Sequence, residues 1–424
     1  NVIVNYRFGK CTFKGTIRQS GDFKDHISML AGGRPYRSLD VKLDKGNIVS
    51  AVQFKLLIPA TRNGENEILT SLILKRFGII SPETFAVEVN LNGMPTTMLF
   101  QENARKELLE KNYRREGPMF EGDEELLWSY KDFELFELEK FALSKVTNKN
   151  WFKKGSSSQA ITLLAYALLQ SAYSEYATNI KQRHQLIVHP NQKDRSEFSK
   201  YVFLLLAMNG DHALRPNNRK YYYNPIISRF EPIYYDGDTS FEPITNVYDS
   251  LDILFTQLDT NVDQNFIKKI NSFLDSKELK VDFTKRAEAL NNKQHQKMNF
   301  GEFYDRAIAQ YSTNIQILYN EISKTLVPTN DNTSNEKSTK QYLKALKSNR
   351  FSQRIIKQLE RSNRGYTATF HSGLQRYLSI EEVSRLIEKN DLDGERTVFL
   401  GNYVDDSKPI SPITKIVGFP GELT

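Results

Sequence analysis

The segment from Gly210 to Asp238 contains the residue types that phosphoryl transfer requires, in the order in which such sites use them. Asp211 follows an apolar stretch and precedes two asparagines, Asn217 and Asn218. Asp236 comes after a tyrosine-rich stretch and is followed directly by a glycine. In phosphoryl transfer, one carboxylate accepts the proton of the attacking hydroxyl, while an amide and a second carboxylate hold Mg²⁺. We therefore expect Asp211 to be the general base, and Asn218 and Asp236 to be ligands of the metal.

The spacing of these residues leaves two assignments open. The base and the metal-binding amide of ordinary protein kinases are about five residues apart, whereas Asn217 and Asn218 lie six and seven residues after Asp211. Asn217 is therefore an alternative to Asn218, and Asp238 is a candidate second metal ligand. Each acid taken alone also fits a helix cap or a turn, so it is the order of all the parts that favours a phosphoryl-transfer site.

A site of this kind also needs a lysine on the nucleotide phosphates, paired with a glutamate on a helix. Lys42 and Lys55 lie on predicted strands, and Glu67 lies on the helix predicted over residues 65–77. Lys55 is nearer to that helix, whereas Lys42 leaves the more usual separation, so both lysines remain candidates. Glu65 is the less favoured alternative to Glu67. The glycines of this region do not form the G-x-G-x-x-G pattern of a phosphate-binding loop.

The elements around these residues predict the fold. Alternating apolar and polar residues predict strands up to about residue 60. A helix follows, and Asn92-Gly93 then predicts a hairpin turn. Later residues are mainly helical, apart from a short pair of strands predicted at 221–223 and 233–235, before Asp236. We therefore predict an α+β protein with a divergent, two-lobed protein-kinase-like fold, which comprises a β-rich N-lobe (1–102), a helical C-lobe with the active site (103–326), a linker (327–340) and a helical C-terminal extension (341–424).

The composition narrows the class of protein. A content of 39% hydrophobic and 12% aromatic residues is typical of a globular chain and argues against disorder. No stretch approaches the roughly 18 consecutive apolar residues of a membrane span, and the first residues do not look like a signal peptide. The single cysteine, Cys11, excludes an internal disulfide and a zinc site built from cysteines. The six histidines show no zinc-binding spacing.

The net charge of +7 is unevenly distributed along the chain. Acidic residues dominate between Glu116 and Glu139, and basic residues recur every three or four positions between Lys340 and Arg364. That period predicts one basic face on a helix over residues 341–361. We expect this basic helix (340–364) to bind an acidic partner such as an acidic protein, a phosphorylated polymer or an anionic membrane, unless it is simply a solvated face. The absence of interleaved aromatic residues gives no specific signal for nucleic acid.

Short motifs within residues 1–240 resemble the spore-coat protein H (CotH) type of atypical kinases. In the order of the chain, these motifs are Phe54-Lys55-Leu56, Arg62-Asn63-Gly64-Glu65-Asn66-Glu67, Phe77-Gly78-Ile79-Ile80-Ser81-Pro82-Glu83-Thr84, Val89-Asn90-Leu91-Asn92-Gly93, Leu99-Phe100-Gln101-Glu102, Asp211-His212, Asn218-Arg219 and Tyr235-Asp236-Gly237. Residues beyond about 250 carry no such resemblance.

The resemblance implies a function and a set of site residues. It implies transfer of phosphate from ATP, with Mg²⁺ or Mn²⁺, to Ser or Thr of a protein substrate. By position, Asp211 matches the catalytic acid, Asn218 and Asp236 match the metal ligands, and Glu102 matches the crossing between the lobes near adenine. The resemblance favours a bacterial secreted, surface or periplasmic location, whereas the lack of disulfides also suits a cytoplasm.

The sequence thus predicts an ATP-dependent atypical protein kinase that moves the γ-phosphate to hydroxyl groups of a protein substrate. Two alternatives use the same fold. In the first, the enzyme transfers a nucleotidyl group or activates a carboxylate for ligation. In the second, the protein is a pseudokinase with a structural or assembly role.

Overall fold

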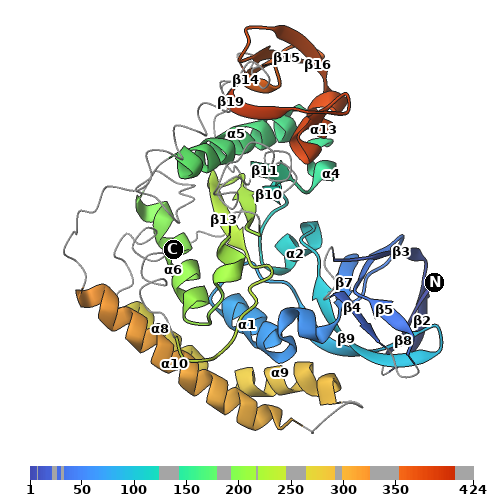
Figure 1. The fold of residues 1–424 in the computed structure, drawn as a ribbon, viewed down its shortest axis with the longest axis vertical. Helices are drawn as coiled ribbons and strands as arrows, with labels where there is room; N and C mark the ends of the chain where they lie inside the picture. The colour runs from blue at the N-terminus through green and yellow to red at the C-terminus, as the bar shows by residue number, and fades with distance from the viewer. Residues whose placement is uncertain are drawn as a thin grey trace, which may run out of the picture. The chain divides into compact units, whose positions relative to one another are not determined.

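The computed structural model describes most of the chain (Figure 1), namely residues 1–6, 8–21, 26–29, 33–123, 143–178, 192–215, 218–244, 264–291, 298–324 and 353–405. The protein is a mixed α+β structure, as predicted. It divides into two compact units that alternate along the chain. The first unit comprises Asn1–Arg114, Ser199–Leu214 and Ile233–Val327, and the second comprises Arg115–Phe198, Arg215–Pro232 and Pro328–Thr424.

A five-stranded antiparallel sheet in the order β3-β6-β7-β9-β8 forms the centre of the first unit. Two separate hairpins, β1-β2 and β4-β5, belong to the same unit. The strands of the unit are β1 (Val2–Tyr6), β2 (Gly9–Phe13), β3 (Gly15–Gln19), β4 (Ile27–Met29), β5 (Pro35–Arg37), β6 (Leu39–Leu43), β7 (Gln53–Leu57), β8 (Thr84–Leu91) and β9 (Met94–Glu102). The predicted hairpin at Asn92-Gly93 is confirmed, because β8 pairs with β9 around it.

The helix predicted over residues 65–77 is confirmed as α1 (Gly64–Arg76). A short 3₁₀ turn, η2 (Pro59–Arg62), precedes it, and Asn63 joins the two elements in the left-handed conformation with φ 49°. The apolar side chains of α1, such as Ile68 and Leu72, are buried in one core with Leu57 and Leu99 of the sheet. This core holds α1 against β7, β8 and β9, and β7 carries the candidate lysine Lys55.

Helices complete the first unit. These are α2 (Lys106–Lys111), the end of α6 (Gln192–Leu206), η5 (Asp211–Leu214), α8 (Gln264–Leu274), α9 (Lys277–Ala287), η6 (Glu288–Asn291) and α10 (Phe300–Lys324). Figure 1 shows α9 running beside α1, and the two helices are in contact. The apolar run from Tyr201 to Met208 is buried in the same core as α1 and α10. This packing fixes the end of α6, which lies just before Asp211 in the chain.

The second unit contains two four-stranded sheets. The first has the order β11-β10-β12-β13, with β10 (Met119–Asp123), β11 (Leu143–Val146), β12 (Lys220–Asn224) and β13 (Arg229–Ile233), whose last residue belongs to the first unit. The short helix α4 (Lys149–Phe152) and the long helix α5 (Ser156–Thr178) follow β11 in the chain. Tyr166 of α5 lies in the core of this unit, where its ring stacks on Phe399.

The second sheet of this unit corrects the predicted C-terminal helix. Its order is β16-β15-β14-β19, and its elements are β14 (Ile355–Arg361), β15 (Gly365–Phe370), β16 (Gln375–Ser379), α13 (Ile380–Lys389), a small hairpin of β17 (Asp391–Leu392) and β18 (Glu395–Arg396), and β19 (Val398–Val404). Residues 355–361 are therefore a strand, and the described part of the predicted helical extension has one helix.

A β-bulge in β14 explains the wrong prediction. The register of β14 shifts between Ile356 and Gln358 in its pairing with both neighbouring strands. Buried Ile355, Ile356 and Leu359 therefore do not alternate as they would in a regular strand, and their spacing imitates one face of a helix. The described part of the predicted basic helix (340–364) is this strand and the turn after it, while residues 340–352 lie outside the described residues.

Candidate functional site

The segment after β13 carries Asp236 into the first unit. Ile233 forms a parallel bridge with Ile80, and the backbone N–H of Tyr234 donates to the carbonyl of Ile80 at 2.8 Å. The chain then turns sharply, because Asp236 and Asp238 both adopt the left-handed conformation, with φ of 53° and 46°. The site is therefore built at a strand end, as the sequence predicts, and its tight turn determines where the Asp236 carboxylate points.

Arg62 is the nearest charged partner of Asp236. One guanidinium nitrogen lies 3.0 Å from Oδ2 of Asp236, and only 10% and 14% of the two side chains are exposed. Burial by itself lowers the pKa of Arg62, but Asp236, Tyr235 and Glu67 together outweigh it, and the pKa is raised. Arg62 opens the Arg62–Glu67 motif, but neither its residue type nor its spacing predicts this ion pair.

The structure places the two candidate lysines differently. Lys55 on β7 donates from Nζ to the hydroxyl of Tyr235 at 2.7 Å, and Nζ lies 5.0 Å from the centre of the tyrosine ring. Lys42 on β6 is exposed and pairs in register with Gln53. Of the two residues, Lys55 is thus the one whose side chain reaches the segment that carries Asp236.

Glu67 is fully buried on α1, and its carboxylate accepts hydrogen bonds from neutral groups. The Tyr234 hydroxyl donates to Oε2, and Nε2 of Gln101 donates to Oε1 at 2.7 Å. Burial raises the pKa of Glu67 to about 7, although Tyr234, Arg62 and Gln101 oppose the shift. Gln101 is also the cross-strand partner of Lys55 between β9 and β7. One residue, Gln101, therefore links the predicted helix glutamate to the strand position of the predicted lysine.

Asp211 begins η5 on a turn that is joined to the segment after Asp236. Asn209 adopts a left-handed conformation with φ 51°, and its amide donates to the carbonyl of Glu242 at 2.9 Å. Nε2 of His212 lies 3.8 Å from Oδ2 of Asp236. Asp211 itself is exposed to solvent. The structure therefore brings the predicted base into the neighbourhood of Asp236 and leaves its carboxylate open to a substrate.

The predicted amide ligand lies in the other unit. Asn218 is half-buried in the turn before β12, and its backbone N–H donates to the carbonyl of Arg215 at 2.9 Å. Asn217 lies outside the described residues. The question of which asparagine supplies the metal-binding amide therefore stays as the sequence left it, with both as candidates.

Glu102 ends β9 as a buried carboxylate. Oε2 accepts from Nζ of Lys111 at 3.0 Å and from the backbone N–H of Glu83 at 3.3 Å. Burial raises the pKa of Glu102 despite the charge of Lys111. The second oxygen, Oε1, is also buried, and it has no hydrogen-bond partner within the described part of the chain. The predicted role near adenine remains a prediction.

Asp236 offers one carboxylate to a hard divalent cation, and its nearest charged neighbour is Arg62. Within the described ranges, no group of three or more His, Cys, Asp or Glu side chains is arranged to hold a metal ion. Mg²⁺ in phosphotransferases usually takes only one or two carboxylates and completes its shell with water and substrate phosphates. Asp236 is such a carboxylate, whereas Oδ1 of Asp238 accepts from the Asn63 amide at 2.8 Å. We conclude that Asp236 fits the chemistry of a single-carboxylate site.

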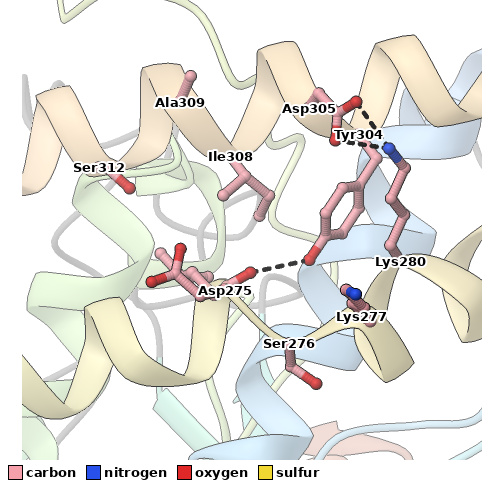
Figure 2. Close-up of a pocket in the computed structure, with 10 residues that line it drawn as sticks. Asp275, Ser276, Lys277, Lys280, Tyr304, Asp305, Ile308, Ala309 and Ser312 are labelled. Atoms are coloured by element: carbon pink, nitrogen blue, oxygen red, sulfur yellow. Dashed lines mark hydrogen bonds and ion pairs between the residues drawn. The ribbon is translucent and has the colours of Figure 1, made fainter.

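A separate pocket of about 420 Å³ lies between α10 and the junction of α8 and α9 (Figure 2). Lys280 and Asp305 form an ion pair at its wall, and the Tyr304 hydroxyl donates to the carbonyl of Leu274 at 3.1 Å. None of the predicted site residues lines this pocket. Several of its polar groups are paired with one another, so we do not assign it a ligand.

Comparison with known proteins gives no independent assignment. No model of a protein family matches the chain, and no curated protein matches it. Among the described residues, the structure has no helix with the length and apolar character needed to cross a membrane.

Proposed function

We propose that the protein is an ATP-dependent phosphotransferase with a divergent, two-lobed kinase-like fold, which transfers the γ-phosphate to Ser or Thr hydroxyls of a protein substrate. The observation that carries this proposal is the convergence on Asp236 in the first unit. Lys55 comes from β7, Arg62 from η2 and His212 from the turn after α6, and all three contact Tyr235 or Asp236. Lys55 and Arg62 bring two positive charges to this segment, which suits the binding of metal-bound phosphates.

The residues take the following roles in this proposal. Asp236 holds Mg²⁺ or Mn²⁺, which neutralises phosphate charge when bound. Lys55 supplies a positive charge for the phosphates, because its Nζ lies at the same segment. Asp211 orients the substrate hydroxyl and accepts its proton, since its exposed carboxylate adjoins His212. Asn218 belongs to the second unit, so its role as the amide ligand stays a prediction from the sequence.

The test is transfer of label from [γ-³²P]ATP to protein in the presence of Mg²⁺ or Mn²⁺. Asp236→Asn should abolish both transfer and metal-dependent ATP binding, whereas Asp211→Asn should retain binding and lose transfer. Asp305→Asn is the matched control, because Asp305 is an exposed aspartate of the same unit, paired with Lys280. Equal transfer by wild type and Asp236→Asn would refute the assignment of the metal ligand.

The arrangement of charges also favours a second candidate, a pseudokinase with a structural or assembly role. Asp236 is neutralised by Arg62, and the described partners of Glu67 are a tyrosine and a glutamine instead of a lysine. A pseudokinase transfers no label from ATP. If it has also lost nucleotide binding, its melting temperature would not change when Mg²⁺ and ATP are added. Label that enters protein only from the α-phosphate would instead indicate nucleotidyl transfer, the third hypothesis.

A further inference from the structure

Arg62 forms an ion pair with the Asp236 carboxylate, which the proposed function assigns to a metal ion. The 3.0 Å contact between its guanidinium and Oδ2 of Asp236 is largely shielded from solvent. Both a guanidinium and a divalent cation are positively charged, and their repulsion is strong where water is excluded. The two cations therefore cannot easily share the same carboxylate oxygen.

The hydrogen bonding of Arg62 is incomplete in this position. Nη1 donates to the carbonyl of Thr61 at 2.9 Å, but Nε is buried and has no hydrogen-bond partner in the described part of the chain. A guanidinium that binds a carboxylate or phosphate usually uses its nitrogens in pairs. The guanidinium thus keeps one donor, Nε, that no described group satisfies.

We propose that Arg62 and a divalent cation compete for Asp236, and that the cation releases the guanidinium to the phosphates of the bound nucleotide. This inference rests on the proposed function. Arg62 suits both positions, because it is the last residue of η2 and its guanidinium lies 5.9 Å from the ring of Tyr235, the residue that Lys55 also contacts. In the metal-free protein, the arginine takes the place of the cation and keeps a buried carboxylate neutralised.

The test is Mn²⁺ binding measured by electron paramagnetic resonance, which detects free aqueous Mn²⁺ and needs no activity. Arg62→Met removes the charge and keeps an unbranched side chain. We expect this variant to bind Mn²⁺ alone on the order of tenfold more tightly than wild type. This gain in Mn²⁺ affinity should disappear in the double variant that also carries Asp236→Asn. In the presence of ATP, the advantage should be lost or reversed, because the variant has no guanidinium to bind phosphate.

Two further variants make the experiment specific. Arg62→Lys keeps a charge at the site, should fold if the methionine variant does not, and should bind Mn²⁺ with an affinity between those of wild type and Arg62→Met. Arg18→Met removes another arginine–aspartate pair of the first unit, at 3.1 Å to Asp40, but on a side chain that is 71% exposed. It should leave Mn²⁺ binding unchanged. Circular dichroism spectra and melting temperatures verify that each variant is folded.

The outcomes separate the inference from the proposed function. If wild type binds Mn²⁺ with ATP, but Arg62→Met and Arg62→Lys bind Mn²⁺ alone no more tightly, competition at Asp236 is overturned and the phosphotransferase proposal stands. A gain in affinity that persists equally with ATP would refute the release of Arg62 to the phosphates. If no variant binds Mn²⁺, with or without ATP, the proposed function fails, and the inference fails with it.

Discussion

Replacement of Glu67 by glutamine should stabilise the protein at high pH, because the native carboxylate is ionised at an energetic penalty. The pKa of Glu67 is raised from its ordinary value of 4.5 to about 7 by complete burial. A pKa above the unfolded value means that the folded protein binds the proton more tightly. The contribution of protonated Glu67 to the stability of the folded protein is thus fully present below pH 4.5 and is lost as the pH rises through about 7.

The expected magnitude follows from the same two pKa values. Each pKa unit corresponds to about 1.4 kcal/mol, so ionisation of Glu67 removes about 3 kcal/mol of unfolding free energy between low and high pH. Glu67→Gln removes the charge and keeps the shape. A flip of the Gln101 amide would turn its Oε1, which is buried without a hydrogen-bond partner among the described residues, towards the new amide as an acceptor. At pH 8 the variant should therefore be more stable than wild type by up to about 3 kcal/mol.

The assay is urea unfolding of the metal-free protein at pH 5 and pH 8, followed by circular dichroism. Hydrogen exchange of α1 peptides assigns the transition to the first unit. Glu65→Gln is the control, since it removes the same charge from a partly exposed position on the same helix. The reasoning is refuted if Glu67→Gln is less stable than wild type at pH 8, or if both proteins lose the same stability between the two pH values.

Three further predictions concern stability. Glu83 is buried, but two cations from α1 and α9 outweigh that burial and lower its pKa to about 2. Glu83→Gln should therefore lose about 3 kcal/mol at pH 7, and titration should show the difference shrinking as the pH falls from 4.5 towards 2. Gly237→Ala should lose about 1–3 kcal/mol in urea unfolding, because its Cβ would lie 2.8 Å from the Tyr234 hydroxyl. Asn390→Ala should lose about 3 kcal/mol in the second unit, because its amide donates to buried Asp123 at 2.6 Å. An unchanged melting temperature would contradict either of the last two predictions.

Local signals were sufficient for several elements of this protein. The apolar spacing of α1 and the Asn92-Gly93 turn between β8 and β9 are both confirmed. Both signals come from residues close in the chain, where side-chain period and turn conformation govern the structure. The sequence also predicts Asp211 on a loop after an apolar helix, and Asp211 begins η5 after the buried end of α6, whereas Asp236 follows the end of β13.

Long-range pairing settled the features that local signals left open or misassigned. The residues of β14 form a strand because β15 and β19 pair with them on either side, and a bulge disguises the alternation. The reach of Lys55 to Tyr235 depends on partners 180 residues apart. Arg62 and Asp236 are also distant in sequence, and their pairing follows from the packing of η2 and α1 against the segment after β13. A sequence therefore lists the charged groups of this site, but only the packed chain shows which of them neutralise one another.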